Sequence, residues 1–182
     1  MKTTWRDKRV GVLFGGLSAE QEISRLTGAG VSQALRERGY AVTPIEVDVG
    51  GAWIAHLRSI DVAFIALHGK FGEDGTVQAV LELLGVPYTG SGVLASALAM
   101  NKPMAKRVWQ TYDLPTPAWQ VIDKEKSEPL TLPYPVVVKP TTEDRVSASV
   151  LFARRKPCTA AWQRPFATIR KRWWRPMSQA KR

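Results

Sequence analysis

Short apolar runs alternate with longer amphipathic segments over the first hundred residues of the chain. The apolar runs predict strands at 9–16, 40–48, 61–68 and 86–91. Between them, a helical period predicts helices at 20–38, 52–59 and 76–84, and another that begins near Val93. Because strands that alternate with helices are typical of a parallel sheet with crossover helices, the pattern predicts an α/β domain.

The ends of the predicted helices carry recognisable signals. Ser18 is expected to cap the first helix, with Gln21 three residues later completing a capping box, and Gly39 is expected to end it. Pro103 interrupts a later helical pattern and predicts a joint between two domains. Beyond this joint we expect a helix at 104–113 and strands of a second domain at 119–122 and 135–139.

The basic charge of the chain is concentrated in its last part. The net charge is +10, but residues 1–143 hold 15 of the 26 Lys and Arg and 15 of the 16 Asp and Glu, which balance. Residues 144–182 therefore hold the other 11 basic side chains and one acid, Asp144. This tail has neither a helical nor a strand period, so we expect it to be disordered. It offers no folded stacking platform, so nucleic-acid binding is disfavoured.

The overall composition is that of an ordinary globular protein, with 45% hydrophobic and 23% charged residues. No apolar run approaches the roughly 20 residues of a membrane helix, and the apolar stretch after the basic start is too short for a signal peptide. We therefore expect a cytoplasmic protein without a membrane partner. The single Cys158 cannot form an internal disulfide and does not predict a metal site.

The segment after the first predicted strand is a candidate for ligand binding. In parallel α/β sheets ligands bind at the carboxyl ends of strands, so the loops after the first and third strands are expected to face one cleft. The first loop contains Gly15, Gly16, Ser18 and Glu20. Its glycines permit close approach, and the amides of a helix start favour a negative group. A plain helix start, in which Glu20 complements the helix dipole, explains these residues equally well.

The loop after the third predicted strand, residues 68–76 (HGKFGEDGT), is more unusual. Three glycines, two carboxylates, a lysine and a histidine in nine residues are hard to explain by packing alone. We therefore expect His68 to belong to a site. A metal centre is disfavoured, because the only other histidine, His56, lies in a predicted helix. The first loop also lacks the GxGxxG pattern, which argues against a dinucleotide-dependent oxidoreductase.

Four motifs, in this order along the chain, resemble one family: VLFGGLSAEQEIS, HGKFGEDGTVQA, ALAMNKPMAK and PVVVKP. With them, residues 8–143 resemble the D-alanine-D-alanine ligases of the ATP-grasp superfamily. The resemblance implies a Rossmann-like parallel-sheet (pre-ATP-grasp) domain over 1–102 and the beginning of an ATP-grasp α+β domain over 103–143. Residues 144–182 are then a basic tail outside the family pattern.

The resemblance also implies roles for the residues of the two loops. Glu20 matches the glutamate that holds the ammonium group of the first D-alanine, a charge-assisted contact that positions the substrate. Gly15, Gly16 and Ser18 lie in the same substrate-binding motif. His68 matches the histidine near the reacting carboxyl and phosphate groups. On this basis Glu20 and His68 are the candidate catalytic residues.

ATP and Mg²⁺ are the cofactors that the resemblance implies. Lys102 and Lys139 match the lysines that contact the ATP phosphates, although Asn101 stands where the family often has Asp. The implied reaction phosphorylates one D-alanine and joins it to a second, giving the dipeptide for peptidoglycan, and the family makes a homodimer possible. A different ATP-grasp carboxylate-amine ligase, such as one that uses D-lactate as the second substrate, is the nearest alternative. A non-enzymatic binding role for the basic tail is a more distant one.

The family pattern should continue after Glu143 with a glycine-serine loop, GSSxGV, but this chain continues with Asp144. Residues 144–153 can be encoded so that one added G before codon 144 yields GSSVGVSIVR in the new frame. We therefore hypothesise that one nucleotide is missing near this codon. The family's phosphate-loop serine and metal-binding residues would then be absent, with no metal ligand in this chain. We expect such a truncated enzyme to be inactive.

Overall fold

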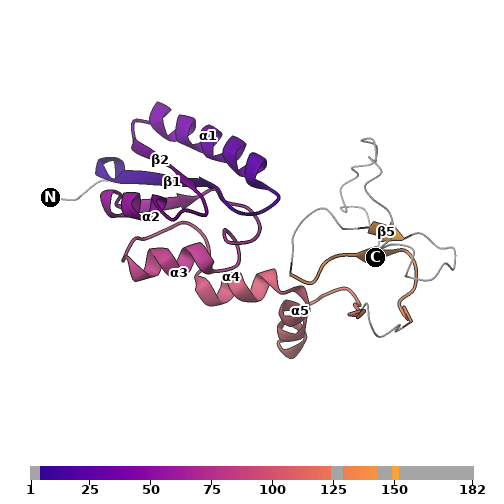
Figure 1. Cartoon of the computed structure of the whole chain (residues 1–182). Coiled ribbons are helices and arrows are strands. Elements are labelled where there is room, and N and C mark those ends of the chain that lie inside the picture. The colour runs from indigo at the N-terminus through magenta and orange to yellow at the C-terminus, as the bar shows by residue number, and fades with distance from the viewer. Residues whose placement is uncertain (1–4, 124–128, 143–148, 152–182) are drawn as a thin grey trace.

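The computed structural model describes residues 5–123, 129–142 and 149–151. Its first part is a parallel three-stranded sheet in the order β2-β1-β3 (Figure 1). The strands are β1 (Arg9–Gly15), β2 (Ala41–Val47) and β3 (Val62–Ile65). In the centre of the sheet, Val10 is paired with Val42 on one side and Val62 on the other. The predicted α/β domain with a parallel sheet is confirmed.

Helices cover both faces of this sheet (Figure 1). On one face α1 (Gln21–Glu37) packs against the buried residues Val10 and Val12 of β1. On the other face the core is formed by Leu13 together with side chains of α2 (Trp53–His56), the short 3-10 helix η2 (Leu57–Ser59) and α3 (Thr76–Leu83). Because successive residues of a strand point to opposite faces, β1 contributes to both cores and its apolar run is explained.

The predicted capping box at the start of α1 is wrong. Glu20 occupies the N-cap position and makes no side-chain cap. Gln21 Nε2 donates to the carbonyl of Gly16 at 3.0 Å, and the Ser18 hydroxyl donates to the carbonyl of His68 at 2.7 Å. Both side chains therefore make contacts outside the helix. The expected end of the helix at Gly39 agrees with the structure, where this residue has a φ of 83° and follows the C-cap Arg38.

The predicted strand at 86–91 is reduced to a single bridge between Tyr88 and Ala63. Pro87 accepts a bond from the Ala63 amide at 2.8 Å but has no N–H of its own to extend the ladder. The third strand is also shorter than predicted, because the chain after Ile65 turns into the glycine-rich loop. The three helices predicted between the strands are present. Those at 20–38 and 76–84 agree with α1 and α3 within two residues, and the one at 52–59 is divided into α2 and the 3-10 helix η2.

Two helices in succession, α4 (Val93–Met100) and α5 (Lys102–Thr111), follow the sheet domain. The break between them lies at Asn101, whose backbone is extended and whose Oδ1 accepts from the Met104 amide at 3.2 Å. Pro103 lies in the first turn of α5, where a missing N–H costs nothing, so it does not itself interrupt a helix. The prediction of a break here is right, and its cause is the capping residue.

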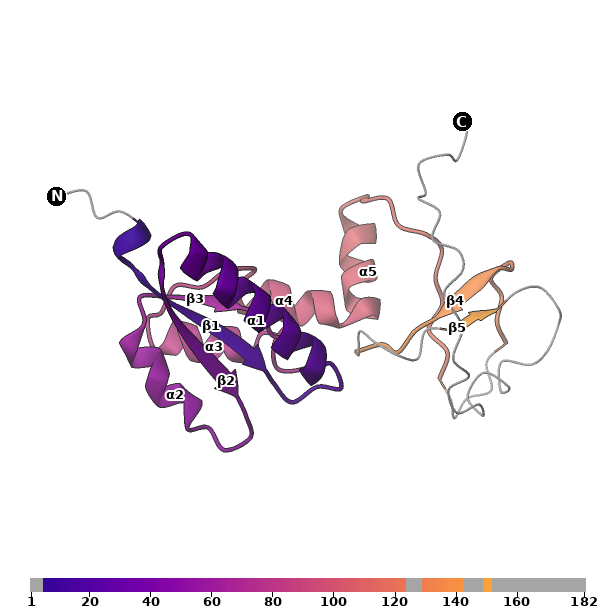
Figure 2. The same ribbon diagram turned by 90° about the horizontal axis from the view of Figure 1, so that it is seen from above.

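Beyond α5, the described residues contain a two-stranded antiparallel sheet of β4 (Val136–Val138) and β5 (Ser149–Leu151) (Figure 2). The predicted strand at 119–122 is wrong: Gln120 instead bonds through its side chain to Pro129 and Thr131. β5 also contradicts the expectation of a tail without strands. The rest of that tail, including Cys158, lies outside the described residues.

The chain begins, within the described part, with the 3-10 helix η1 (Trp5–Asp7), which leads into β1. Among the described residues, none of the helices combines the length and the apolar character that crossing a bilayer requires.

Candidate functional site

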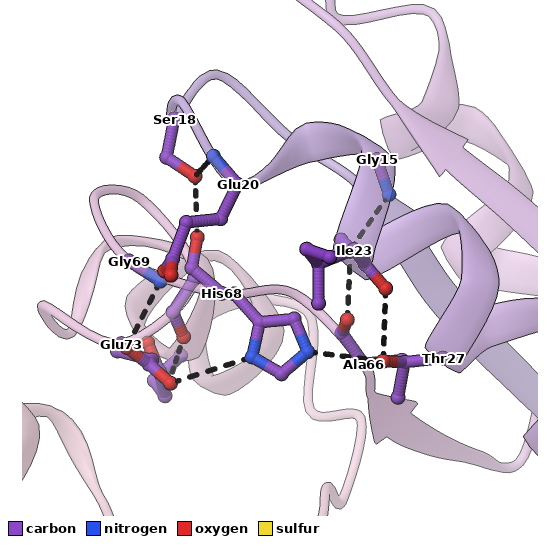
Figure 3. Close-up of polar contacts among 12 residues, drawn as sticks. Gly15, Ser18, Glu20, Ile23, Thr27, Ala66, His68, Gly69 and Glu73 are labelled. Atoms are coloured by element: carbon purple, nitrogen blue, oxygen red, sulfur yellow. Dashed lines mark hydrogen bonds and ion pairs between the residues drawn. The ribbon is translucent and has the colours of Figure 1, made fainter. Parts of the chain in front are cut away.

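The loops after β1 and β3 meet at the carboxyl edge of the sheet (Figure 3). The Ser18 hydroxyl donates a hydrogen bond of 2.7 Å to the backbone carbonyl of His68 and accepts one of 3.1 Å from the amide of Glu20. One side chain therefore joins the two loops that the sequence singles out. Because β1 and β3 are parallel neighbours, both loops leave the sheet in the same direction.

Two glycines shape the first loop. Gly15 and Gly16 have φ angles of 87° and 85°, a region that disfavours residues with a Cβ. A Cβ on Gly16 would also lie 3.0 Å from the Leu67 side chain, and the Gly16 amide donates to Val47 in β2 at 2.9 Å. These glycines are required for the turn itself. Their predicted role in substrate binding stays a prediction.

A buried serine fixes the position of α1 against both strand ends. The Ser24 hydroxyl accepts from the Gly15 amide at 2.9 Å and donates to the Ala66 carbonyl at 2.7 Å, and its side chain is fully buried. Both strand ends therefore satisfy a backbone group through the same side chain. The helix that begins after Glu20 cannot shift relative to the sheet without breaking these bonds.

The carboxylate of Glu20 lies against the start of the second loop. A Cβ placed on Gly69 would be 3.2 Å from Glu20 Oε2 and 3.2 Å from the Ser18 Cβ. Gly69 has a φ of 67°, so both its conformation and its surroundings favour glycine. This glycine permits the close approach of the Glu20 side chain to the loop that carries His68 (Figure 3).

The imidazole of His68 lies between α1 and its own loop. Its Nε2 is 3.2 Å from Thr27 Oγ1, and its Nδ1 is 3.8 Å from Glu73 Oε1. About a third of the side chain is exposed, at 32%. The ring is therefore held on two sides while it remains accessible from the solvent.

The rest of the second loop is held by its own carboxylates. Glu73 Oε2 accepts from the Gly69 amide at 2.9 Å, and Asp74 accepts from the amides of Phe71 and Thr76 at 2.9 and 3.0 Å. Burial raises the pKa of Asp74, but these donated hydrogen bonds outweigh it, so the pKa of this carboxyl is below its usual value. Asp74 is thus explained as a structural residue of the loop, which leaves Glu73 as the carboxylate beside His68.

The two predicted ATP-binding lysines belong to another part of the molecule. Lys102 begins α5, and its amide donates to the Thr141 carbonyl at 2.9 Å, which ties α5 to the segment after β4. Lys139 follows β4 directly and is exposed. Figure 2 shows β4 on the far side of α5 from the three-stranded sheet. The structure thus groups Gly15, Gly16, Ser18, Glu20 and His68 and places Lys139 apart from them.

Chemically, the grouped loops offer a carboxylate, an imidazole and a second carboxylate at one edge of a rigid sheet. Such a set can bind a cationic group and exchange a proton. Within the described ranges, no group of three or more His, Cys, Asp and Glu side chains could hold a metal ion.

Sequence reasoning missed three residues of this arrangement: Ser24, Thr27 and Glu73. Ser24 and Thr27 follow Glu20 at positions i+4 and i+7, so they share its face of the helix, and this spacing could have identified them. The sequence marks Glu73 only as one of two carboxylates in the loop. Its position 3.8 Å from His68 Nδ1 distinguishes it from Asp74, and the sequence does not contain that information.

Comparison with known proteins points to one family. The family model for the D-ala D-ala ligase N-terminus matches residues 9–59 and 54–91. A D-alanine-D-alanine ligase of Geotalea uraniireducens is 52% identical over 141 residues, which are 76% of this chain and 46% of that protein. One of Bordetella avium is 48% identical over 143 residues, 77% of this chain and 45% of that protein. The chain spans about half the length of the curated relatives it matches.

Solved structures lead to the same family. The crystal structure of a D-alanine-D-alanine ligase from Bacillus anthracis complexed with ATP superposes with a TM-score of 0.70 at 35% identity. The match covers 81% of this chain and 51% of that one. Family model, curated relatives and solved structure thus agree over the domain that carries Glu20 and His68. Residues 9–91 therefore belong to the D-alanine-D-alanine ligase family, as the N-terminal domain of such an enzyme.

Proposed function

We propose that residues 9–142 form the part of an ATP-dependent ligase that binds the first of two D-alanine molecules. One arrangement supports the proposal: the Glu20 carboxylate and the His68 imidazole reach the same edge of the sheet from loops that Ser18 joins. Membership of the N-terminal domain in the ligase family supports the same substrate.

Each side chain has a role that its chemistry suits. Glu20 accepts a charge-assisted hydrogen bond from the ammonium group of the amino acid, in a half-buried position where such a contact is stronger than in water. Binding the ammonium group at a fixed point also orients the carboxylate of the substrate. His68, which is partly exposed beside it, exchanges a proton with the reacting groups.

In the proposed reaction a carboxylate oxygen of the first D-alanine attacks the terminal phosphorus of ATP, and ADP leaves. The amine of a second D-alanine then attacks the carbonyl carbon of this acyl phosphate, forms the amide bond and releases phosphate and a proton. Lys102 and Lys139 contact the phosphates of ATP, where compact ammonium groups suit spread negative charge. Mg²⁺ is the further cofactor that the resemblance implies. Within the described ranges no group of three or more His, Cys, Asp and Glu side chains could hold it alone, and Mg²⁺ usually binds through the phosphates of the substrate with one or two carboxylates.

We further propose that this 182-residue chain binds D-alanine but does not ligate it. Residues 144–149 do not contain the glycine-serine loop that the family pattern places after Glu143. Acceleration of the chemical step requires contacts that form in the transition state. The contacts that we propose for Glu20 only position the substrate. The same reasoning applies whether the second substrate is D-alanine or D-lactate.

Binding can be measured on the whole chain by titrating D-alanine into the ¹⁵N-labelled protein and following amide shifts. Glu20→Gln should weaken binding about tenfold or more, the loss expected for a charge-assisted hydrogen bond. Glu22→Gln is the matched control, because Glu22 lies on the same helix turn but is 78% exposed and pairs with Arg25. Equal affinity of all three proteins would refute the role of Glu20. D-alanine-dependent release of phosphate from ATP would refute the proposed lack of ligation.

A further inference from the structure

We propose that Thr27 is a positioning residue that holds His68 in the tautomer with hydrogen on Nε2, so that Nδ1, beside Glu73, is the nitrogen that takes up a proton. The inference rests on the proposed function in that it concerns the histidine of the same site. Its evidence is independent of any ligand, because it comes from the hydrogen bonds around the ring (Figure 3).

The Thr27 hydroxyl lies between two possible hydrogen-bond partners. Thr27 Oγ1 lies 2.9 Å from the carbonyl oxygen of Ile23, one turn earlier in α1, and 3.2 Å from His68 Nε2. A hydroxyl has one hydrogen to donate and two lone pairs that accept. Threonine in a helix commonly donates to the carbonyl four residues before it, and here this oxygen is the nearer partner. The hydroxyl therefore accepts from the ring, and Nε2 must carry the hydrogen.

The other ring nitrogen of His68, Nδ1, lies near Glu73. His68 Nδ1 is 3.8 Å from Glu73 Oε1, which is too long for a hydrogen bond, so the carboxylate does not hold a hydrogen on Nδ1 of the neutral ring. The carboxylate is itself fixed, because its Oε2 accepts from the Gly69 amide at 2.9 Å. A proton that arrives at Nδ1 then lies next to a negative charge at a defined distance.

Together these contacts give the two nitrogens different tasks. Nε2 anchors the ring to α1, and α1 is tied to the sheet through Ser24. Nδ1 keeps a lone pair in the neutral ring and can accept a proton from a substrate group. Hydrogen bonding at one nitrogen commonly decides which form a histidine adopts at the other. In the proposed reaction, the amine that attacks the acyl phosphate loses a proton. Nδ1 of His68 is an atom of this site that can receive it.

The tautomer can be read directly by NMR on the ¹⁵N-labelled whole chain without ligand. Two-bond ¹H–¹⁵N spectra of the imidazoles, recorded in alkaline buffer where histidine is neutral, distinguish Nε2–H from Nδ1–H forms. The chain has 2 histidines, so His56 is an internal reference. We expect the Nε2–H form for His68. Thr27→Val should reduce the ratio of Nε2–H to Nδ1–H about fivefold, as the loss of one ordinary hydrogen bond implies. Thr27→Ser should keep the ratio.

A second variant keeps the test decisive if Thr27→Val does not fold. Glu73→Gln should leave the Nε2–H form in place, because the carboxylate does not hold a hydrogen on Nδ1. An Nδ1–H form in the unmodified chain, or a switch of tautomer in Glu73→Gln, would overturn the proposal. So would an unchanged ratio in a folded Thr27→Val. None of these outcomes depends on D-alanine binding, which Glu20→Gln tests separately.

Discussion

The hydroxyl of Ser18 and the backbone carbonyl of His68 are joined by a hydrogen bond of 2.7 Å, although the residues are 50 positions apart in the sequence. This bond connects the loop after β1 with the loop after β3. It also orients the start of α1, because the Glu20 amide donates to the same hydroxyl at 3.1 Å. The candidate site therefore depends on a tertiary contact that takes the place of the expected helix cap.

The buried hydroxyl of Ser24 should contribute measurably to stability. Ser24→Ala removes two hydrogen bonds and leaves the Gly15 amide and the Ala66 carbonyl without that partner, so we expect a loss of about 1–3 kcal/mol in the free energy of unfolding. Ser32→Ala is a matched control. Ser32 is also buried on α1, but its hydroxyl has no hydrogen-bond partner among the described residues, so the same change should cost little. Urea unfolding followed by circular dichroism measures both, and equal losses would contradict the assignment.

Two glycines of α1 should respond to alanine with opposite signs. A Cβ on Gly28 would lie 2.4 Å from the Phe14 Cβ, so Gly28→Ala must push the helix away from β1 and should cost about 1–3 kcal/mol. A Cβ on Gly30 meets nothing within 4 Å, so Gly30→Ala should stabilise the helix by about 0.5–1 kcal/mol. Thermal unfolding of the two variants checks the signs. A Gly28→Ala variant as stable as the unmodified chain would show that α1 does not pack as closely on β1 as described.

The layered domain could be predicted from the sequence because its signals are local. Burial on both faces makes β1 apolar along its length, and the helices that cover the sheet keep a regular spacing of apolar positions. The meeting of Glu20 and His68 also follows from a general rule, since parallel strands end at one edge. What was predicted correctly thus depends on periodicity and on chain direction.

The errors concern residues whose partners are distant in the sequence. Ser18 and Gln21 have the spacing of a capping box, but contacts with His68 and Gly16 replace it. Residues 119–122 have the composition of a strand, and no neighbouring strand pairs with them among the described residues. The helical spacing places Thr27 on the same face of α1 as Glu20, but its contact with His68, 41 positions away, appears only in the structure.

The ion pair between Arg9 and Asp61 should make stability depend on pH. Two side-chain hydrogen bonds of 3.0 Å from Arg9, and one of 2.7 Å from its amide, hold the pKa of Asp61 well below its usual value of 3.8. A lowered pKa means that the ionised group stabilises the folded state above pH 3.8 and that this contribution is lost as the pH falls further. Asp61→Asn should therefore be less stable than the unmodified chain near neutral pH, and the gap should close in acid.

The control for this pair is the partner residue. Arg9→Met removes the guanidinium that is the main cause of the shift, so it should flatten the same acid limb of the stability profile. Urea unfolding at a series of pH values measures the profiles. A gap between Asp61→Asn and the unmodified chain that is constant with pH would contradict the prediction.

The reading frame near codon 144 gives the last prediction. We expect the gene to encode GSSVGVSIVR from this codon in a neighbouring frame. The shift makes the first two bases of each old codon the last two bases of a new one, so only a few residues are possible at each new position. Agreement with the family loop under this restriction supports the hypothesis. The shifted frame replaces Ser149, Val150 and Leu151 with valine, serine and isoleucine. Valine and isoleucine favour strands, so we expect the pairing with β4 to be kept. Sequencing the gene tests this directly, and a neighbouring frame without GSSVGV would exclude it.

If the frame is present, restoring one nucleotide should yield a protein with D-alanine-dependent phosphate release from ATP, measured beside the 182-residue chain. Glu20→Gln in the restored protein should lower that activity if Glu20 and the restored C-terminal part act on the same D-alanine.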